Sequence, residues 1–305
     1  MRYAVLSDIH SNLEALTAVL EALASERIDR TLCLGDVVGY GADPRACLER
    51  LQACDALVVG GNHDAVCVGK LDLGWFNETA QASLVWTRDQ LSVTDLDWLR
   101  RLLLVETVEP FTPYHEEVPP APNDQGRTGP VKAGPVGRPS NGAGRAQRSI
   151  PFQQVGTGSS RGAGFTLVHG SLSRPERFEY LVDLAQIVDT LTTCRTLMCL
   201  AGHTHQPCFV EYDRTQRTVL RVLTRAEELA TVAFRDDAAT VRYLVNPGSV
   251  GQPRDGDPRA SVAVIDTDEK RLSIHRVRYD LETAARKIRQ AGLPGFFADR
   301  LAVGR

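Results

Sequence analysis

Short apolar runs alternate with helix-like segments through the first third of the chain, and this alternation restricts the fold more than any other feature. RYAVLSD, RTLCLGD and ALVVGGN each have the length and composition of one buried strand. After the first run, apolar residues recur at helical spacing from Leu13 to Leu23, behind Ser11 and Glu14 at the spacing of a capping box. The pattern is that of an α/β domain whose strands are covered by helices.

Further helices are expected in the same region. Pro44 behind Asp43 predicts a short helix over 44–53, because proline is favoured at the first helical position. Two more are predicted at 77–91 and 94–104, the second capped by Thr94. The second half holds a helix near 180–193, a C-terminal helix over 280–290, and strand-like runs that suggest a second, largely antiparallel sheet. Those runs are 207–212, 218–223, 229–234, 240–245, 260–266 and 271–278.

Residues 111–163 differ from the rest of the chain. They hold 9 Gly and 8 Pro in 53 positions and few large apolar residues, a composition typical of disorder. Lys and Arg number six there against three acidic residues, so the segment is mildly basic. We expect a single domain over 1–305 that carries a disordered insertion at 111–163.

Composition excludes several classes of protein. The net charge of −3 gives no reason to expect nucleic acid or an anionic membrane as a partner. No apolar run has the length of a membrane span, and the first ten residues do not read as a signal peptide. The 7 cysteines include no CxxC pair and are expected to be reduced. The sequence therefore predicts a soluble cytoplasmic protein.

Polar residues gather where the apolar runs end. Five of the 7 histidines fall in these places, whereas His115 lies in the insertion and His275 in a late strand. Any one motif could be a turn or a helix cap. Turns and helix caps do not readily explain all five motifs together. Strand ends in α/β sheets converge on one crevice, so these side chains would lie close to one another. The motifs are SDIH with Asp8 and His10, GDVVG with Asp36, GGNHD with Asn62, His63 and Asp64, LVHG with His169, and AGHTH with His203 and His205.

Such a crevice would need cations. Burying carboxylates, an amide and several imidazoles together is costly unless a positive charge compensates them. The donors are oxygen and nitrogen without thiolate, which favours Mn²⁺, Fe or Zn²⁺ over a structural zinc–thiolate site. Seven candidate ligands exceed what one tetrahedral ion takes and suit two ions. Paired ions about 3.5–4 Å apart activate a shared water and clamp the oxygens of a displacement at phosphorus.

The series DxH, GDxxG, GNHD, a later histidine and GHTH resembles the calcineurin-like metallophosphoesterase superfamily. The segment NPGSVGQPRDGDPRASVAVID at 246–266 is similar to the later part of its small bacterial phosphodiesterase-type members. The resemblance implies a four-layer α/β/β/α sandwich of two mixed β-sheets flanked by helices. It also implies a hydrolase with two divalent ions, most simply Mn²⁺, in which a metal-bridging hydroxide attacks a small phosphorylated substrate.

Roles for single residues follow from the same resemblance. His63 would be the imidazole that is not a ligand and assists the leaving oxygen, and Asp64 would orient it. An imidazole free of metal keeps a pKa near 6.5 and can act as an acid, which suits that role. Asp8, His10 and His205 would bind one ion, Asn62, His169 and His203 the other, with Asp36 bridging.

The sequence departs from protein serine/threonine phosphatases of that superfamily. Gly39 and Tyr40 occupy the places where those enzymes carry an arginine motif, and Asp64 stands where they have glutamate. Phosphodiesters or nucleotides are therefore the favoured substrates. The alternatives are a protein or dinucleoside-polyphosphate phosphatase and a non-catalytic scaffold on the same fold, which would not need His63.

The loop at 246–258 could supply substrate contacts. Asn246, Ser249, Arg254 and Asp255 are the candidates, since no arginine in the other motifs is placed to meet a phosphate. The alternative is a turn-rich connection between two strands.

Overall fold

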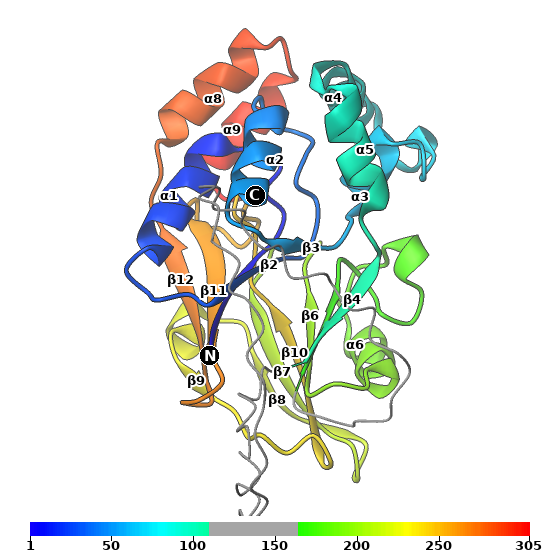
Figure 1. Ribbon diagram of the computed structural model, residues 1–305, viewed down its shortest axis with the longest axis vertical. Coiled ribbons are helices and arrows are strands. Elements are labelled where there is room, and N and C mark those ends of the chain that lie inside the picture. The colour runs from blue at the N-terminus through cyan, green and yellow to red at the C-terminus, as the bar shows by residue number, and fades with distance from the viewer. Residues whose placement is uncertain (110–163) are drawn as a thin grey trace, which may run out of the picture. The chain divides into compact units, whose positions relative to one another are not determined.

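Two six-stranded mixed β-sheets make up the centre of the molecule (Figure 1). The computed structural model describes residues 1–109 and 164–305. The predicted insertion at 111–163 lies outside the described residues. None of the helices in the described ranges is long and apolar enough to cross a membrane.

The first sheet combines the N-terminal strands with strands from the end of the chain. β1 pairs in parallel with β2, and β2 with β3, whereas β11 lies antiparallel to the other side of β1. The order is β3 (Leu57–Val58), β2 (Arg30–Cys33), β1 (Arg2–Leu6), β11 (Ala260–Asp266), β12 (Arg271–Val277) and β9 (Val232–Ala233).

The second sheet is built from the middle of the chain. β5, β6 and β10 are parallel neighbours. β4 is antiparallel to β5, β7 is antiparallel to β10, and β8 is antiparallel to β7. The order is β4 (Val105–Val108), β5 (Phe165–Val168), β6 (Met198–Ala201), β10 (Val241–Asn246), β7 (Cys208–Asp213) and β8 (Thr218–Leu223).

Alternation along β1 shows how the sheets are buried. Tyr3 and Val5 belong to the apolar core that the two sheets share, whereas Ala4 and Leu6 belong to the core beneath the helices. Successive side chains of a strand point to opposite faces, so β1 is buried on both sides. Strands of this kind read as continuous apolar runs, which is how they appear in the sequence.

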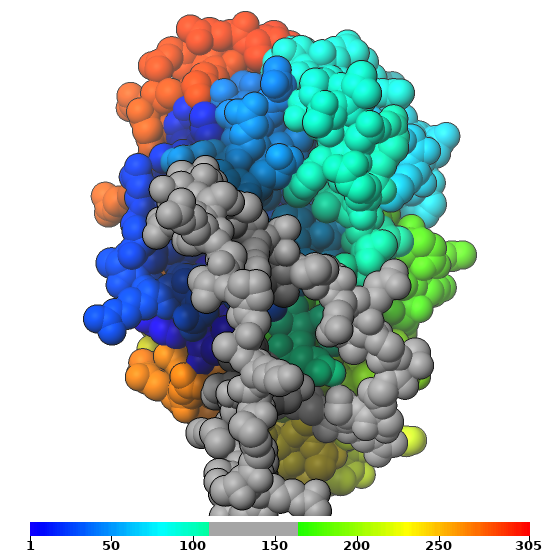
Figure 2. All heavy atoms as spheres, in the orientation of Figure 1, coloured from blue at the N-terminus to red at the C-terminus, as the bar shows by residue number. Residues whose placement is uncertain are grey.

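Helices cover the outer face of each sheet. α1, α2, α4 and α5 contribute to the core on the outer face of the first sheet, and α6 packs on the second. These layers confirm the predicted α/β/β/α sandwich. The α8–α9 pair has a small core of its own and lies against α1 (Figures 1 and 2). The helices are α1 (Leu13–Leu23), α2 (Pro44–Ala53), α3 (Asn62–Cys67), α4 (Glu78–Gln90), α5 (Val93–Arg101), α6 (Leu184–Thr193), α7 (Ala226–Leu229), α8 (Leu281–Gln290) and α9 (Gly295–Leu301).

Several local predictions were wrong. The runs at 229–234, 260–266 and 271–278 contribute β9, β11 and β12 to the first sheet rather than to the second. The helix predicted at 94–104 ends earlier, at Arg101, and a short connection leads from there to β4.

Two predicted helix caps were also wrong. The side chain that caps α1 is Asn12, which accepts from the Ala15 amide at 3.0 Å, and not Ser11. Ser92 rather than Thr94 caps α5.

Candidate metal centre and active site

The polar strand ends converge as the sequence predicted. Asp8 and His10 follow β1, Asp36 follows β2, His169 follows β5, and the GHTH histidines follow β6. Asn62, His63 and Asp64 form the first residues of α3, which begins after the cap at Gly61. All nine side chains are buried.

The backbone at this centre is strained. Five candidate ligands have positive φ angles, a region that residues other than glycine seldom adopt. Such conformations cost about 1–3 kcal/mol each and cluster at functional sites. They are Asp8 (52°), His10 (48°), Asp36 (52°), His203 (67°) and His205 (60°).

Three imidazoles share one arrangement. The Nδ1 of each lies within hydrogen-bonding distance of a backbone carbonyl from another segment, which makes Nδ1 the donor and leaves the Nε2 lone pair free. Metal-binding histidines are commonly oriented in this way. The pairs are His10 with Val38 (3.2 Å), His169 with Leu34 (2.7 Å), and His205 with Gln252 (2.6 Å).

The free nitrogens face one another around the carboxylates. Nε2 of His10 lies 3.1 Å from Nε2 of His205, which in turn lies 3.2 Å from Oδ1 of Asp8. Two lone pairs at that separation repel each other unless a cation lies close to both. Asp8, His10 and His205 therefore form one group that could hold a metal ion.

A second group surrounds His169. Its Nε2 lies 3.0 Å from Nδ1 of His203, 3.0 Å from Oδ1 of Asn62 and 3.3 Å from Oδ2 of Asp36. Asp36, His169 and His203 have the spacing of a metal site, and Oδ2 of Asp36 is also 3.7 Å from Nε2 of His10. Asp36 thus lies between the two groups.

The electrostatics of the centre favour a cation. Oδ1 of Asp8 is buried, and no donor among the described residues hydrogen-bonds to it. Burial would raise the pKa of Asp8, but His205 and His169 hold that pKa below its usual range. Burial would lower the pKa of His169, but Asp36 and Asp8 raise it to about 9. Near neutral pH the carboxylates of Asp8 and Asp36 therefore stay ionised, and His169 carries a second proton at Nε2 that a metal ion would displace.

His63 is not a member of these two groups, but with His10 and Asp36 it forms a third cluster whose spacing could hold a metal ion. Its ring is buried between Tyr40 and Phe76, at centroid distances of 4.4 and 4.9 Å. Nε2 lies 4.0 Å from Oδ2 of Asp36, and no described residue hydrogen-bonds to Nδ1. Burial lowers the pKa of His63 to about 4 although Asp36 opposes the effect. A Cβ on Gly39 would lie 2.4 Å from Nδ1, so glycine is required there for the ring to fit.

Asp64 does not orient His63 directly, which corrects the role that the resemblance implied. Its Oδ1 accepts from the amides of Val37 (3.0 Å) and Val38 (3.2 Å), and its Oδ2 from the amide of Gly61 (3.0 Å). The carboxylate therefore joins the loop after β2 to the start of α3. It positions His63 only through the backbone.

Asn246 and Ser249 are also placed differently from the prediction. The Asn246 amide donates to the Gly202 carbonyl at 2.7 Å, and the Ser249 hydroxyl to the Asp8 carbonyl at 2.7 Å. Both side chains are buried and support the strand-end loops from behind. Asp255 pairs with Arg276. These three are therefore structural residues and not substrate contacts.

Arg254 is the residue of that loop that reaches the centre. Its guanidinium lies 6.0 Å from the ring centroid of Tyr40, and Nη2 donates to Oε1 of Gln252 at 2.8 Å. No carboxylate in the described part of the chain lies within ion-pair distance, and Nε is buried without a partner. The side chain is thus a cation available to an anionic ligand.

A model of the calcineurin-like phosphoesterase superfamily domain matches residues 1–270. The chain belongs to this family. The motifs that suggested the family lie inside the matched region, and they are the residues that converge in the folded protein.

The chain is similar to proteins of about its own length. The chain is 31% identical over 302 residues to the uncharacterized protein MJ0912 of Methanocaldococcus jannaschii, which covers 99% of this chain and 98% of the relative. A metallophosphoesterase from Sphaerobacter thermophilus superposes with a TM-score of 0.70 at 30% identity, covering 100% and 99% of the two chains. The hypothetical protein PH1004 from Pyrococcus horikoshii OT3, at 19% identity and a TM-score of 0.65, shares the fold over 100% and 98%.

A cavity of about 630 Å³ opens beside the candidate metal centre. Asp36, Asn62, His63, His203 and His205 form its floor. Its walls include Tyr40, Phe76 and Tyr180, which the sequence analysis did not place at the site. The position of Tyr40 directly after the GDVVG motif could have indicated that it lies at the site. Nothing in the sequence around Phe76 or Tyr180 indicated this.

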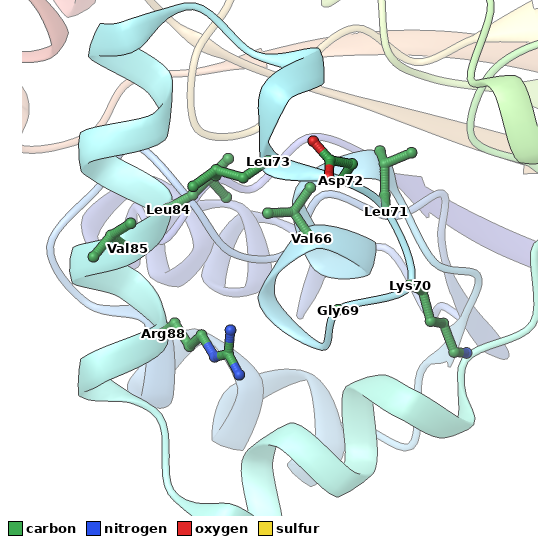
Figure 3. Close-up of a pocket in the computed structure, with 9 residues that line it drawn as sticks. All are labelled: Val66, Gly69, Lys70, Leu71, Asp72, Leu73, Leu84, Val85 and Arg88. Atoms are coloured by element: carbon green, nitrogen blue, oxygen red, sulfur yellow. The ribbon is translucent and has the colours of Figure 1, made fainter.

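A second hollow lies between α3 and α4 (Figure 3). It has a volume of about 380 Å³ and is lined by residues that include Lys70, Asp72 and Arg88. None of the groups of metal-binding side chains among the described residues lies there. The two hollows share only Leu71, so the candidate chemistry belongs to the larger cavity.

Proposed function

We propose that this protein is a dimetal phosphoesterase that hydrolyses phosphodiesters or nucleotides. The observation that carries the proposal is the set of three imidazoles, each tethered at Nδ1, whose free nitrogens surround two buried carboxylates. A non-catalytic scaffold has no use for the additional, unpaired His63 at the cavity floor. The seven free cysteines suit a reducing compartment, so we place the protein in the cytoplasm.

The residues present fit two divalent ions, with Mn²⁺ preferred and Fe or Zn²⁺ as alternatives. Bound there, such ions would supply Lewis-acid stabilisation of phosphoryl oxygens and lower the pKa of water. The expected ligands are Asp8, His10 and His205 for one ion and Asn62, His169 and His203 for the other, with Asp36 bridging.

The surrounding residues would bind the substrate and assist its leaving group. Arg254 binds an anionic oxygen of the substrate, since its guanidinium lacks a carboxylate partner. Burial keeps the pKa of His63 at about 4, so the ring would protonate the leaving oxygen only once the negative charge of a bound phosphate raises that pKa. Phe76 and Tyr40 pack against the ring and exclude water. A general acid placed in this way contributes about 10²- to 10⁴-fold to a rate.

Removal of the metals tests the proposal. Protein stripped with a chelator is expected to lose hydrolysis of bis(p-nitrophenyl) phosphate, and Mn²⁺ is expected to restore it with about two ions bound per chain, as in other two-metal centres. A panel of monoesters, diesters and cyclic nucleotides then defines the preference. Equal rates in stripped and reloaded protein, measured with metal analysis of the same samples, would exclude the dimetal mechanism.

The role of Arg254 gives a separate prediction. Arg254→Ala should raise KM for a phosphodiester about tenfold or more, because a charge-assisted hydrogen bond worth about 1.5–3 kcal/mol is lost. Arg254→Lys should restore part of the affinity, since it keeps the charge but not the planar fork. The control is Arg289→Ala, which removes an exposed arginine that pairs with Asp299. An unchanged KM in Arg254→Ala would remove this residue from the substrate site.

A further inference from the structure

The cavity carries more apolar surface than a phosphate group can use. Beyond the metal-binding floor and the side chains of Tyr40 and Arg254, its lining comes from two segments, 71–80 before and at the start of α4, and 177–186 before and within α6. Each segment presents large side chains with apolar surface to solvent at the cavity. These side chains are Trp75 (62% exposed), Tyr180 (45%) and Val182 (72%).

Trp75 is presented by an anchored turn. Asp72 accepts from the Gly74 amide at 2.6 Å, and Gln81 donates to the Phe76 carbonyl at 2.7 Å, so both sides of Trp75 are held. Leu73 lies beside Leu84 of α4, and Figure 3 shows the two side chains together. A large indole held in the open by a fixed turn costs little ordering entropy when a flat ligand binds to it.

The second wall is similarly fixed. The Glu179 carbonyl accepts from the Ser171 amide at 3.0 Å, and the Glu179 carboxylate pairs with Arg174 at 3.0 Å. Tyr180 stacks on His203 with a centroid distance of 3.8 Å and an interplanar angle of 17°. Aromatic surface therefore extends outward from a candidate metal ligand toward the solvent.

We propose that these two walls form a subsite for a nucleobase, so that the substrate is a nucleotide or nucleoside phosphodiester. The inference rests on the proposed function and names its substrate class. Aromatic side chains bind bases by stacking, which does not depend on base identity.

The polar groups near the walls favour a base over an alkyl chain. Oδ1 of Asn77 accepts from the Ala80 amide, and Oε1 of Gln186 accepts from the Val182 amide. The amino group of each side chain is left as a donor at the cavity. A heteroaromatic ring offers acceptors to such donors, whereas a hydrocarbon chain would leave them unpaired.

A pair of matched substrates tests the subsite. Wild-type protein with Mn²⁺ should hydrolyse a dinucleoside monophosphate about tenfold faster, in kcat/KM, than the same diester built on abasic riboses. Trp75→Ala should bring that ratio close to one, and Trp75→Phe should keep most of it. Val93→Ala, which trims an exposed side chain (74%) on another helix, should leave the ratio as in wild type. Equal kcat/KM for both diesters, or an unchanged ratio in Trp75→Ala, would overturn the proposal.

A binding measurement separates this proposal from the catalytic one. Adenosine 5′-monophosphate should quench tryptophan fluorescence, ribose 5-phosphate should not, and Trp75→Phe should abolish the quenching. If wild type hydrolyses neither diester but the nucleotide quenches, the catalytic proposal fails and the subsite stands. If neither ligand quenches, the subsite is excluded whatever the activity.

Discussion

His63→Ala is expected to lower kcat for a phosphodiester by about 10²- to 10⁴-fold while both metal ions stay bound. The proposed ligand sets do not include His63, although it lies near His10 and Asp36, so metal content after this substitution tests that assignment directly. Its ring lines the cavity, and its nearest carboxylate oxygen, Oδ2 of Asp36, is 4.0 Å away. Loss of the ring removes a proton donor from the leaving oxygen but removes no tethered ligand.

Three measurements make the result decisive. Metal content by elemental analysis and the unfolding temperature should match wild type, which shows that the centre is intact. A leaving group of low pKa should rescue His63→Ala in part, because such a group needs less protonation. His275→Ala is the matched control, since that imidazole bonds to Ser273 at 3.0 Å on β12 and should not affect kcat. Unchanged kcat in His63→Ala would rule out the acid role.

Asp36→Asn is expected to abolish hydrolysis by preventing retention of the metal ions. Asp36 is the carboxylate between the two ligand groups, 3.3 Å from Nε2 of His169 and 3.7 Å from Nε2 of His10. An asparagine keeps the shape, and its oxygen can still accept from the His63 amide as Oδ1 of Asp36 does at 2.9 Å. It loses the negative charge that a bridging ligand supplies, so ion content should fall from about two to below about one per chain.

A control variant tests whether the loss of any carboxylate lowers metal content. Asp268→Asn removes a carboxylate that is 84% exposed and should leave metal content and activity as in wild type. Retention of two ions by Asp36→Asn, with activity within a few-fold of wild type, would contradict the bridging role. Loss of activity with both ions retained would instead assign Asp36 to the reaction rather than to metal binding.

The architecture was predictable to the extent that it depends on local periodicity. Strand-length apolar runs and helical spacing are properties of neighbouring residues, so the α/β pattern and helices such as α2 and α8 could be predicted from the sequence. The pairing of β11 with β1 could not. Both are apolar and buried on two faces, and nothing in their residues says which sheet they join.

The candidate ligands were predictable because the ends of strands in α/β sheets meet. Their residue types already implied oxygen and nitrogen coordination. Asn246, Ser249 and Arg254 show the limit of such reasoning, because all three are polar residues of one short segment at and after the end of β10. Only the folded structure shows that Asn246 and Ser249 donate hydrogen bonds to backbone carbonyls, whereas Arg254 lines the cavity.

The sequence by itself determined the family, the layered fold and the set of donors that could bind metal. The tertiary structure decided which nitrogen each imidazole presents. That choice depends on the backbone carbonyls of Leu34, Val38 and Gln252. These carbonyls lie 135, 28 and 47 residues along the chain from the histidines that they orient, His169, His10 and His205. It also decided that aromatic walls extend the site, because Trp75 and Tyr180 come together with the motifs only when the chain is folded.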